Sequence, residues 1–292
     1  MPSFDLVLQA IVSGLLIGGI YALISVSLAL VFGVMRVLNF AHGDLLMLAM
    51  YGVVILNHEL GIPPYLAALI LVPIMGLFGA LLFQFTIKPV LNSSPLMQAQ
   101  LTIGLSFVIQ SVALLVFGAD LLNVNSAFGD SAYRIGGVVI ALPQLVGFLI
   151  SMLVCGLLSV FLTMTEAGHR IRSTALDPTM AWLCGVDVKR TRLLVFSGCI
   201  AMLAIPAACL MTFSYVTPSV GIRLSVLSLL VVVLGGLGDL RGAFAGGLII
   251  GLLESLAGAL LNNPAAPSLT YLVFGAALLF RPQGLFGRGS NA

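Results

Sequence analysis

A short polar segment interrupts the first apolar stretch of the sequence and carries the side chains best suited to chemistry. Within nine positions it holds Arg36, Asn39, His42, Gly43 and Asp44. His42 and Asp44 are two positions apart, which places them on different faces of a helix, so their spacing does not favour an acid–base pair. Polar groups inside a membrane persist mainly where they face a bundle interior or a water-filled path. The segment therefore predicts either the lining of a translocation path or an ordinary surface loop between two helices.

Glu254 is the one carboxylate that the sequence places well inside a predicted span, 12 residues into an apolar run that begins near residue 242. A donor on another helix, such as Arg223, would satisfy this carboxylate; the alternatives are a protonated or a snorkelling side chain. We count Glu254 among the candidate residues of a translocation path, and a purely structural role fits the sequence equally well.

A basic loop at 166–192 stands out in an otherwise apolar chain, because it holds five of the 12 Lys and Arg residues. Asp177 followed by Pro178 predicts a helix N-cap and first helical residue, and Gly185 predicts the end of that helix. A two-turn helix is marginal alone in water, and this one carries Trp182. It therefore needs either a groove on a cytoplasmic partner or the lipid headgroup layer to lie against.

Other reactive patterns do not emerge from the sequence. The three histidines are far apart, and neither a Ser/His/Asp triad nor a paired-carboxylate site is evident. The four cysteines lack CxxC spacing, which argues against a disulfide framework or a zinc site. The glycine-rich stretch 234–247 lacks the GxxxxGK[ST] pattern of a phosphate-binding loop and predicts a tight turn with Asp239 and Arg241 paired. We expect no catalysis, no metal and no cofactor bound by this chain.

The elements around these residues are predicted to be membrane-spanning helices. Of the 292 residues, 60% are hydrophobic and only 8% are charged, and the mean hydropathy is +1.19, whereas soluble domains carry roughly 25% charged residues. Apolar runs of about 20 residues span a bilayer as helices, and lipid excludes open sheets. The runs lie at about 6–34, 41–58, 64–87, 97–119, 140–164, 193–215, 221–236, 242–262 and 268–281. We predict one all-α polytopic membrane domain over 1–292, with eight or nine hydrophobic segments. The run at 41–58 could be a full span, a tilted half-helix or a re-entrant segment.

The charged residues between the runs predict the orientation, since Lys and Arg collect in short cytoplasmic loops. Three basic segments are placed inside on this ground: the loop 166–192, the turn at Lys88, and the tail with Arg281 and Arg288. The stretch 120–138 and the turn at 262–267 then fall outside, and the side of the N-terminus stays undetermined. The formal net charge of +2 comes from these clusters and gives no sign of a nucleic-acid partner.

Glycines spaced four apart predict which helices are buried, because small residues let helix backbones approach closely in lipid. Examples are Gly14 with Gly18, Gly242 with Gly246, and Gly247 with Gly251. We therefore expect the first helix and the helix at 242–262 to be buried in the bundle.

Three stretches carry a family resemblance. Residues 14–51 contain the box NFAHGD, preceded by GIYAL and VFGVM; residues 171–204 contain the basic loop's helix; residues 233–255 begin VLGGLGDLRGAFAGG. These stretches resemble, in the same order, the permeases of branched-chain amino-acid ABC importers, specifically their H-type inner-membrane subunit. The second is similar to the family's cytoplasmic coupling region and the third to its C-terminal block.

The resemblance implies a multi-pass subunit of the bacterial inner membrane that works by alternating access. Its implied partners are a second permease (a related chain or a second copy), two ATP-binding subunits that use the ATP, a periplasmic substrate-binding protein and membrane lipid. The coupling helix would hold Asp177, Pro178, Ala181, Trp182 and Gly185. The residues nearest the path would be Asn39, His42, Gly43 and Asp44.

The sequence departs from the family pattern at Ser173, where Ala is common, at His169, where Arg or Lys is common, and at 205–210, which replaces an Ala/Gly-rich stretch. These departures affect the prediction of which solute is transported more than the prediction of the transport mechanism. A small neutral or zwitterionic solute is expected, with branched-chain amino acids first and urea, short amides or aromatic acids as alternatives. A different class of answer is an ion-coupled secondary transporter, in which Asp44 and Glu254 would be the coupling carboxylates.

Overall fold

The computed structural model describes residues 4–124, 131–135 and 137–261, together with 271–272, 275, 279 and 284–285. The helices are α1 Phe4–Met35, α2 His42–Leu60, α3 Pro64–Leu82, the π-helical η1 Phe83–Ile87, α4 Lys88–Val90, α5 Pro95–Phe117, α6 Leu142–Met164, α7 Glu166–Leu176, α8 Pro178–Leu183, α9 Val188–Met202, α10 Ala204–Met211, α11 Val220–Gly235 and α12 Leu240–Leu261. The predicted turn at 262–267, Arg281, Arg288 and most of the run at 268–281 lie outside the described residues.

The described chain is an all-α polytopic membrane protein, as predicted. Seven of its helical segments are long and apolar enough to cross a membrane, and α11 adds a shorter apolar helix of 16 residues. Helices α9 and α10 follow each other as one such segment. Within the described ranges, a single two-stranded antiparallel sheet occurs, formed by β1 (Ala132–Ile135) and β2 (Val138–Ala141).

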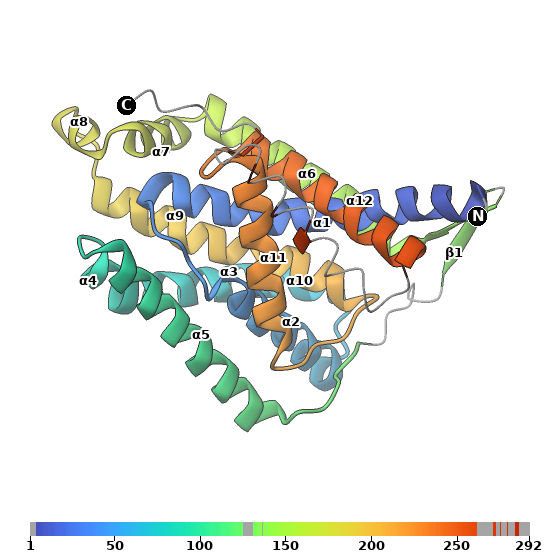
Figure 1. Ribbon diagram of the computed structural model, residues 1–292. Helices are drawn as coiled ribbons and strands as arrows, with labels where there is room; N and C mark the ends of the chain where they lie inside the picture. The colour runs from blue at the N-terminus through green and yellow to red at the C-terminus, as the bar shows by residue number, and fades with distance from the viewer. Residues whose placement is uncertain are drawn as a thin grey trace.

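The molecule has two distinct ends (Figure 1). One, here called the α8 end, carries α4, α7 and α8; the other, the hairpin end, carries β1 and β2. Lys88 and the basic loop 166–192 therefore share an end, and the stretch around 132–138 lies opposite them, in agreement with the relative placement predicted from the charges.

The N-terminal part of α1 lies at the hairpin end, which the sequence left undetermined. The side chain of Gln9 makes two hydrogen bonds to the backbone of Val139 in β2: its Nε2 donates to the carbonyl oxygen (2.8 Å) and its Oε1 accepts from the N–H (2.7 Å). Helix α1 thus runs from the hairpin end to the α8 end.

Close glycine contacts join α1 to α12, as predicted. A methyl group added at Gly14 would lie 2.9 Å from the carbonyl oxygen of Gly251, and one at Gly18 would lie 3.0 Å from the Cα of Leu248. Helix α1 is buried over most of its apolar core, as expected, although Leu6, Leu8, Ile11 and Leu15 near its N-terminal end are exposed. The expectation for α12 is only half right, because only a third of its span is buried.

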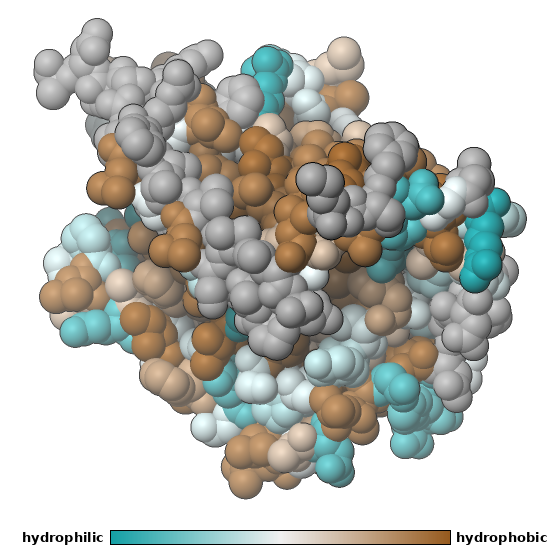
Figure 2. Space-filling model, turned by 45° about the vertical axis from the view of Figure 1, so that its right-hand side comes forward, coloured by the Kyte–Doolittle hydropathy of each residue, from teal (hydrophilic) through white to brown (hydrophobic). Residues whose placement is uncertain are grey.

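Much of the surface of the molecule is apolar. Figure 2 shows broad areas of hydrophobic residues, with hydrophilic residues gathered mostly towards the edges of the molecule. Helices α5 and α6 bury the smallest share of their length among the long apolar helices. Their exposed Leu, Val, Phe and Met side chains form a surface suited to lipid tails or to another membrane subunit.

Candidate functional site

The polar segment at 36–44 turns back into the bundle between α1 and α2. The turn begins at Arg36, which has a positive φ of 57°. The Nε2 of His42 lies 3.1 Å from the carbonyl oxygen of Ile24 and 3.0 Å from the hydroxyl of Ser27. Ile24 precedes the last residue of α1 by 11 positions, or about 16 Å at 1.5 Å per residue. Helix α2 therefore begins deep in the protein, and the surface-loop interpretation is wrong.

Asp44 lies in the first turn of α2 and is fully buried. Its carboxylate accepts hydrogen bonds from the hydroxyl of Ser106 (2.5 Å) and from the Nε2 of Gln110 (2.9 Å). Eleven residues of α5 precede Ser106 and eleven follow it, so this network lies near the middle of the span. The N-terminal end of a helix also favours a negative charge.

Helix α11 begins at the same depth and touches α2 backbone to backbone. The N–H of Gly43 donates to the hydroxyl of Ser225 (2.8 Å). A methyl group added at Gly43 would collide with the backbone of Gly221 and Ser225, and one added at Gly221 would collide with the Asp44 carboxylate. Glycine is therefore required at both positions, and two helices start face to face inside the membrane domain.

A cavity of about 450 Å³ lies beside this junction. It lies between α5, α11 and the α1–α2 connection, and most of its lining is apolar. Its lining residues are Phe40, Ile103, Ser106, Phe107, Ile222, Ser225, Val226, Leu229, Leu230 and Val233. Two of them, Ser106 and Ser225, hydrogen-bond to Asp44 and Gly43 respectively. The cavity thus meets the polar junction through two hydroxyl groups.

Asn39 and His42 stabilise the turn rather than line this cavity. The side-chain oxygen of Asn39 accepts from the N–H of Ala41 (3.1 Å), and both Asn39 and His42 are buried. In the part of the chain that the structure describes, the Nδ2 of Asn39 and the Nδ1 of His42 have no hydrogen-bond partner. Among the described residues, no three His, Cys, Asp or Glu side chains lie close enough to hold a metal ion.

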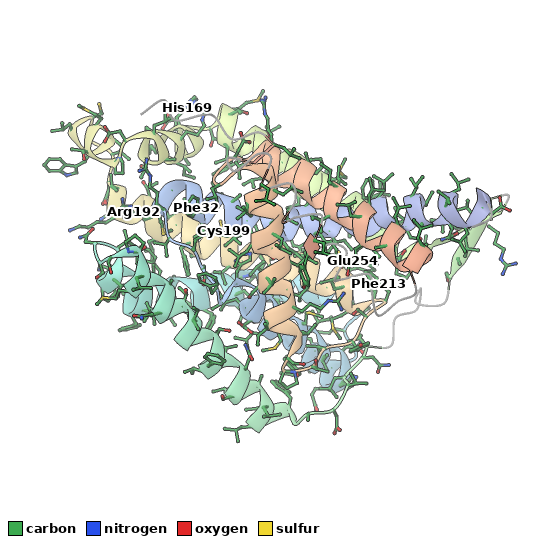
Figure 3. All side chains as sticks on the ribbon, in the orientation of Figure 1. Phe32, His169, Arg192, Cys199, Phe213 and Glu254 are labelled. Carbon is green, nitrogen blue, oxygen red and sulfur yellow. The ribbon has the colours of Figure 1, made fainter. Side chains whose placement is uncertain are left out.

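Glu254 is separate from that junction and pairs with Arg223, the donor that the sequence predicted. The Nη2 of Arg223 on α11 lies 2.8 Å from the Oε1 of Glu254 on α12. Figure 3 labels Glu254 on α12, near α11. Helices α11 and α12 therefore share this second polar cluster.

The predicted short helix in the basic loop is present as α8. The Asp177 carboxylate caps it by accepting from the N–H groups of Thr179 (2.8 Å) and Met180 (3.1 Å), and Gly185 follows with a φ of 85°. Trp182 is 66% exposed, whereas Ala181 is only 4% exposed. Trp182 therefore points away from the bundle. Ala181, expected with the coupling residues, is packed inside the chain.

The predicted ion pair in the 234–247 turn is wrong. The Asp239 carboxylate instead accepts from the backbone N–H groups of Arg241 (2.8 Å) and Gly242 (3.0 Å). Asp239 thus caps the first turn of α12, a role that the local sequence also allows.

Sequence reasoning missed the polar side of α5. Four of its residues repeat every fourth position and lie on the side facing the bundle: Gln98, Thr102, Ser106 and Gln110. The Thr102 hydroxyl donates to the carbonyl oxygen of Leu38 (3.3 Å), and the Gln98 amide donates to carbonyl oxygens of the preceding turn. This spacing is visible in the sequence, because residues four apart share one helix face.

The family model and the individual relatives found by comparison with known proteins agree with one another. Residues 10–281 match the family model described as branched-chain amino acid transport system / permease component. The high-affinity branched-chain amino acid transport system permease protein BraD of Pseudomonas aeruginosa is 29% identical over 99% of this chain and 98% of its own length. Its counterpart LivH of Escherichia coli is 28% identical over 96% of both chains. A probable LivH of Methanocaldococcus jannaschii is 27% identical over 97% of this chain and 94% of its own.

No solved structure matches the chain. The family match covers nearly all of the sequence, including α2, α8, α11 and α12. The chain therefore belongs to the family of permease components of branched-chain amino acid transport systems.

Proposed function

We propose that this chain is the membrane-spanning permease subunit of an ATP-binding-cassette importer in the bacterial inner membrane. It moves a small neutral or zwitterionic solute inward by alternating access, with branched-chain amino acids as the first candidates. It pairs with a second permease, two ATP-binding subunits and a periplasmic substrate-binding protein. The partner subunits hydrolyse the ATP. The names of its relatives support the transport role and the solute class.

The single observation that carries the coupling part of this proposal is the exposed apolar side of α7 and α8. Large apolar side chains there point away from the bundle: Leu176, Met180, Trp182 and Leu183. A six-residue helix has little stability of its own in water, and an exposed apolar patch marks a contact surface. An ATP-binding subunit that binds this surface more tightly in one conformation than in the other would shift the equilibrium between them.

The test is the variant Trp182→Asp in the reconstituted importer. A carboxylate placed in an apolar docking surface is desolvated without a partner, so the ATP-binding subunits should no longer co-purify and ATP-driven leucine uptake should be lost. Leu121→Asp is the matched control, because Leu121 is 65% exposed and follows α5 towards the hairpin end. Normal co-purification and uptake with Trp182→Asp would contradict the proposal.

An ion-coupled secondary transporter is the second candidate, favoured by one observation. Helices α2 and α11 both begin inside the membrane domain, and interrupted helices of this kind are common in secondary transporters. Asp44 and Glu254 would then be the coupling carboxylates. Leucine uptake by vesicles that contain this chain alone, driven by a proton or sodium gradient, would favour this candidate and remove the ATP-driven one.

The alternative solutes are tested in the same reconstituted system. Competition of unlabelled urea, acetamide or benzoate against labelled leucine would separate the alternatives. Inhibition by valine and isoleucine alone is the expected outcome.

A further inference from the structure

Arg223 lies at the middle of the membrane domain. On α11 it is placed between Gly221, which packs on Asp44, and Ser225, which hydrogen-bonds to Gly43. Asp44 is bonded to Ser106, the central residue of α5. Since an α-helix rises 1.5 Å per residue, Arg223 lies within about 3 Å of the depth of both glycine contacts.

The Arg223 side chain is 59% exposed, although it lies at mid-span, and its partner Glu254 is 22% exposed. Charged groups at the bilayer centre are costly and face a bundle interior or a water-filled cavity. The face of α11 that carries Arg223 is therefore turned towards water or another protein chain rather than towards lipid tails.

Glu254 holds the guanidinium but uses few of its donors. A guanidinium has five N–H groups in a planar fork, and among the described residues the hydrogen bond from Nη2 to Glu254 is the one it makes. The remaining donors suit a carboxylate, which arginine binds in a bidentate manner more readily than lysine does.

An apolar surface lies beside this cation. Ile222 and Val226, on either side of Arg223 in the sequence, line the cavity beside α11. Leu230, seven residues further on and so on the same face of the helix as Arg223, lines it too. A ligand that fits both features carries a carboxylate and an aliphatic group.

We propose that Arg223, oriented by Glu254, receives the carboxylate of the solute as it crosses the membrane, while the cavity beside α11 takes the aliphatic side chain. This inference rests on the proposed importer function. It narrows the solute class to carboxylates, against urea and neutral amides. It also assigns part of the selectivity to the permease itself.

The test uses Arg223→Cys in the complete importer, in a Cys184→Ser background that removes the exposed native thiol. Leu153→Cys is the matched control, because Leu153 is 62% exposed and is the central residue of α6, a helix with little buried surface. Membrane-impermeant methanethiosulfonates should label Arg223→Cys much faster than Leu153→Cys, and leucine should slow the labelling of Arg223→Cys.

Restoring a positive charge at position 223 tests whether this site recognises a carboxylate. Loss of a charge-assisted contact should reduce leucine uptake by Arg223→Cys by about tenfold or more. Modification with the trimethylammonioethyl reagent should recover part of this uptake, whereas the sulfonatoethyl reagent should not. Arg134→Gln, which removes an exposed arginine from β1, should leave uptake unchanged.

Three results would overturn the inference. Labelling of Arg223→Cys as slow as that of Leu153→Cys would mean that water does not reach the face of α11 that carries Arg223. Loss of the second permease from purified Arg223→Gln complexes would mean that Arg223 forms an ion pair between subunits. Equal recovery with both reagents would exclude carboxylate recognition. A different result would contradict the proposed importer function itself: a wild-type complex that neither binds ATP-binding subunits nor takes up leucine.

Discussion

Gly43 and Gly221 decide how closely two helices approach at the centre of the membrane domain. Each leaves room for the backbone or the carboxylate of the facing helix, with no space for a methyl group. Neither glycine has a positive φ, so the requirement is one of space and not of backbone conformation.

We predict that Gly221→Ala destabilises the protein by about 1–3 kcal/mol, because overpacking forces the backbones of α2 and α11 apart. The midpoint of thermal unfolding in detergent measures the effect. Gly104→Ala is the matched control: Gly104 also lies in a helix, and an added methyl group there meets no atom of the described residues within 4 Å. Its unfolding midpoint should stay the same or rise, since Ala favours a helix over Gly. Equal unfolding midpoints for the two variants would contradict the prediction.

Asp44 is the acceptor for two donors of α5, so its replacements should differ in a defined order. Asp44→Ala leaves the buried Ser106 hydroxyl without its acceptor, at a cost of about 1–3 kcal/mol for a buried group left unpaired. The Gln110 amide loses Asp44 but still donates to the Ser106 hydroxyl. Asp44→Asn keeps one acceptor oxygen and should lose less stability. If Asn proves as damaging as Ala in thermal unfolding, the negative charge itself, rather than the hydrogen bonds, holds the junction together.

At the scale of elements, α5 is attached to the bundle by a polar side in addition to buried apolar residues such as Ile109 and Ala113. The hydrogen bonds of Gln98, Thr102, Ser106 and Gln110 reach the turn before α5, the α1–α2 connection and Asp44. The opposite side of α5 is apolar and exposed. We therefore expect α5 to exchange its amide hydrogens earlier than the second half of α1, which is almost entirely buried.

Gln98 offers a test of this attachment. Its amide donates to the carbonyl oxygens of Val90, Leu91 and Ser93, so Gln98→Leu should speed amide hydrogen exchange in the first turns of α5 and in residues 90–94. Exchange in α1 should not change. Gln84→Leu replaces an exposed glutamine of η1 and should leave exchange at 90–94 as in the wild type; similar acceleration by both variants would remove the special role of Gln98.

The sequence predicts local elements better than it predicts their meeting points. Asp177, Pro178 and Gly185 define α8 because a cap, a first-turn proline and a stop act within a few residues. The pairing of Arg223 with Glu254 is also predictable, because each is a rare charge in an apolar helix that requires a partner. The polar side of α5 could have been found from its four-residue spacing.

The contact of Gly43 with Ser225 joins residues 182 positions apart, and no local pattern encodes it. The depth of the 36–44 segment is equally hidden, because a loop at the surface and a connection that returns into the bundle have the same polar composition. His42 reveals the difference only through its bonds to Ile24 and Ser27. Likewise, the sequence shows Ala181 beside Trp182 but not which of the two faces outward.

At the scale of the whole molecule, the α8 end and the hairpin end must lie on opposite sides of the membrane. We predict that the native Cys184 at the α8 end, which is exposed, reacts with an impermeant maleimide only from the cytoplasmic side. Tyr133→Cys in β1, where Tyr133 is 60% exposed, should react only from the other side. Labelling of intact cells and of inverted vesicles distinguishes the two sides, and labelling of both residues from one side would overturn the predicted orientation.

Helix α1 is 32 residues long, or about 48 Å, well beyond the roughly 30 Å of a hydrocarbon core. Its second half, from Leu16 onward, is almost entirely buried in protein and has no need to match the lipid around the molecule. Helices α5 and α6, each 23 residues long and largely exposed, are the ones that do. Bilayers with longer or shorter acyl chains should therefore change the tilt of α5 and α6 while α1 keeps its position. Hydrophobic mismatch would then alter the cavity wall formed by α5 before it alters the glycine contacts between α2 and α11.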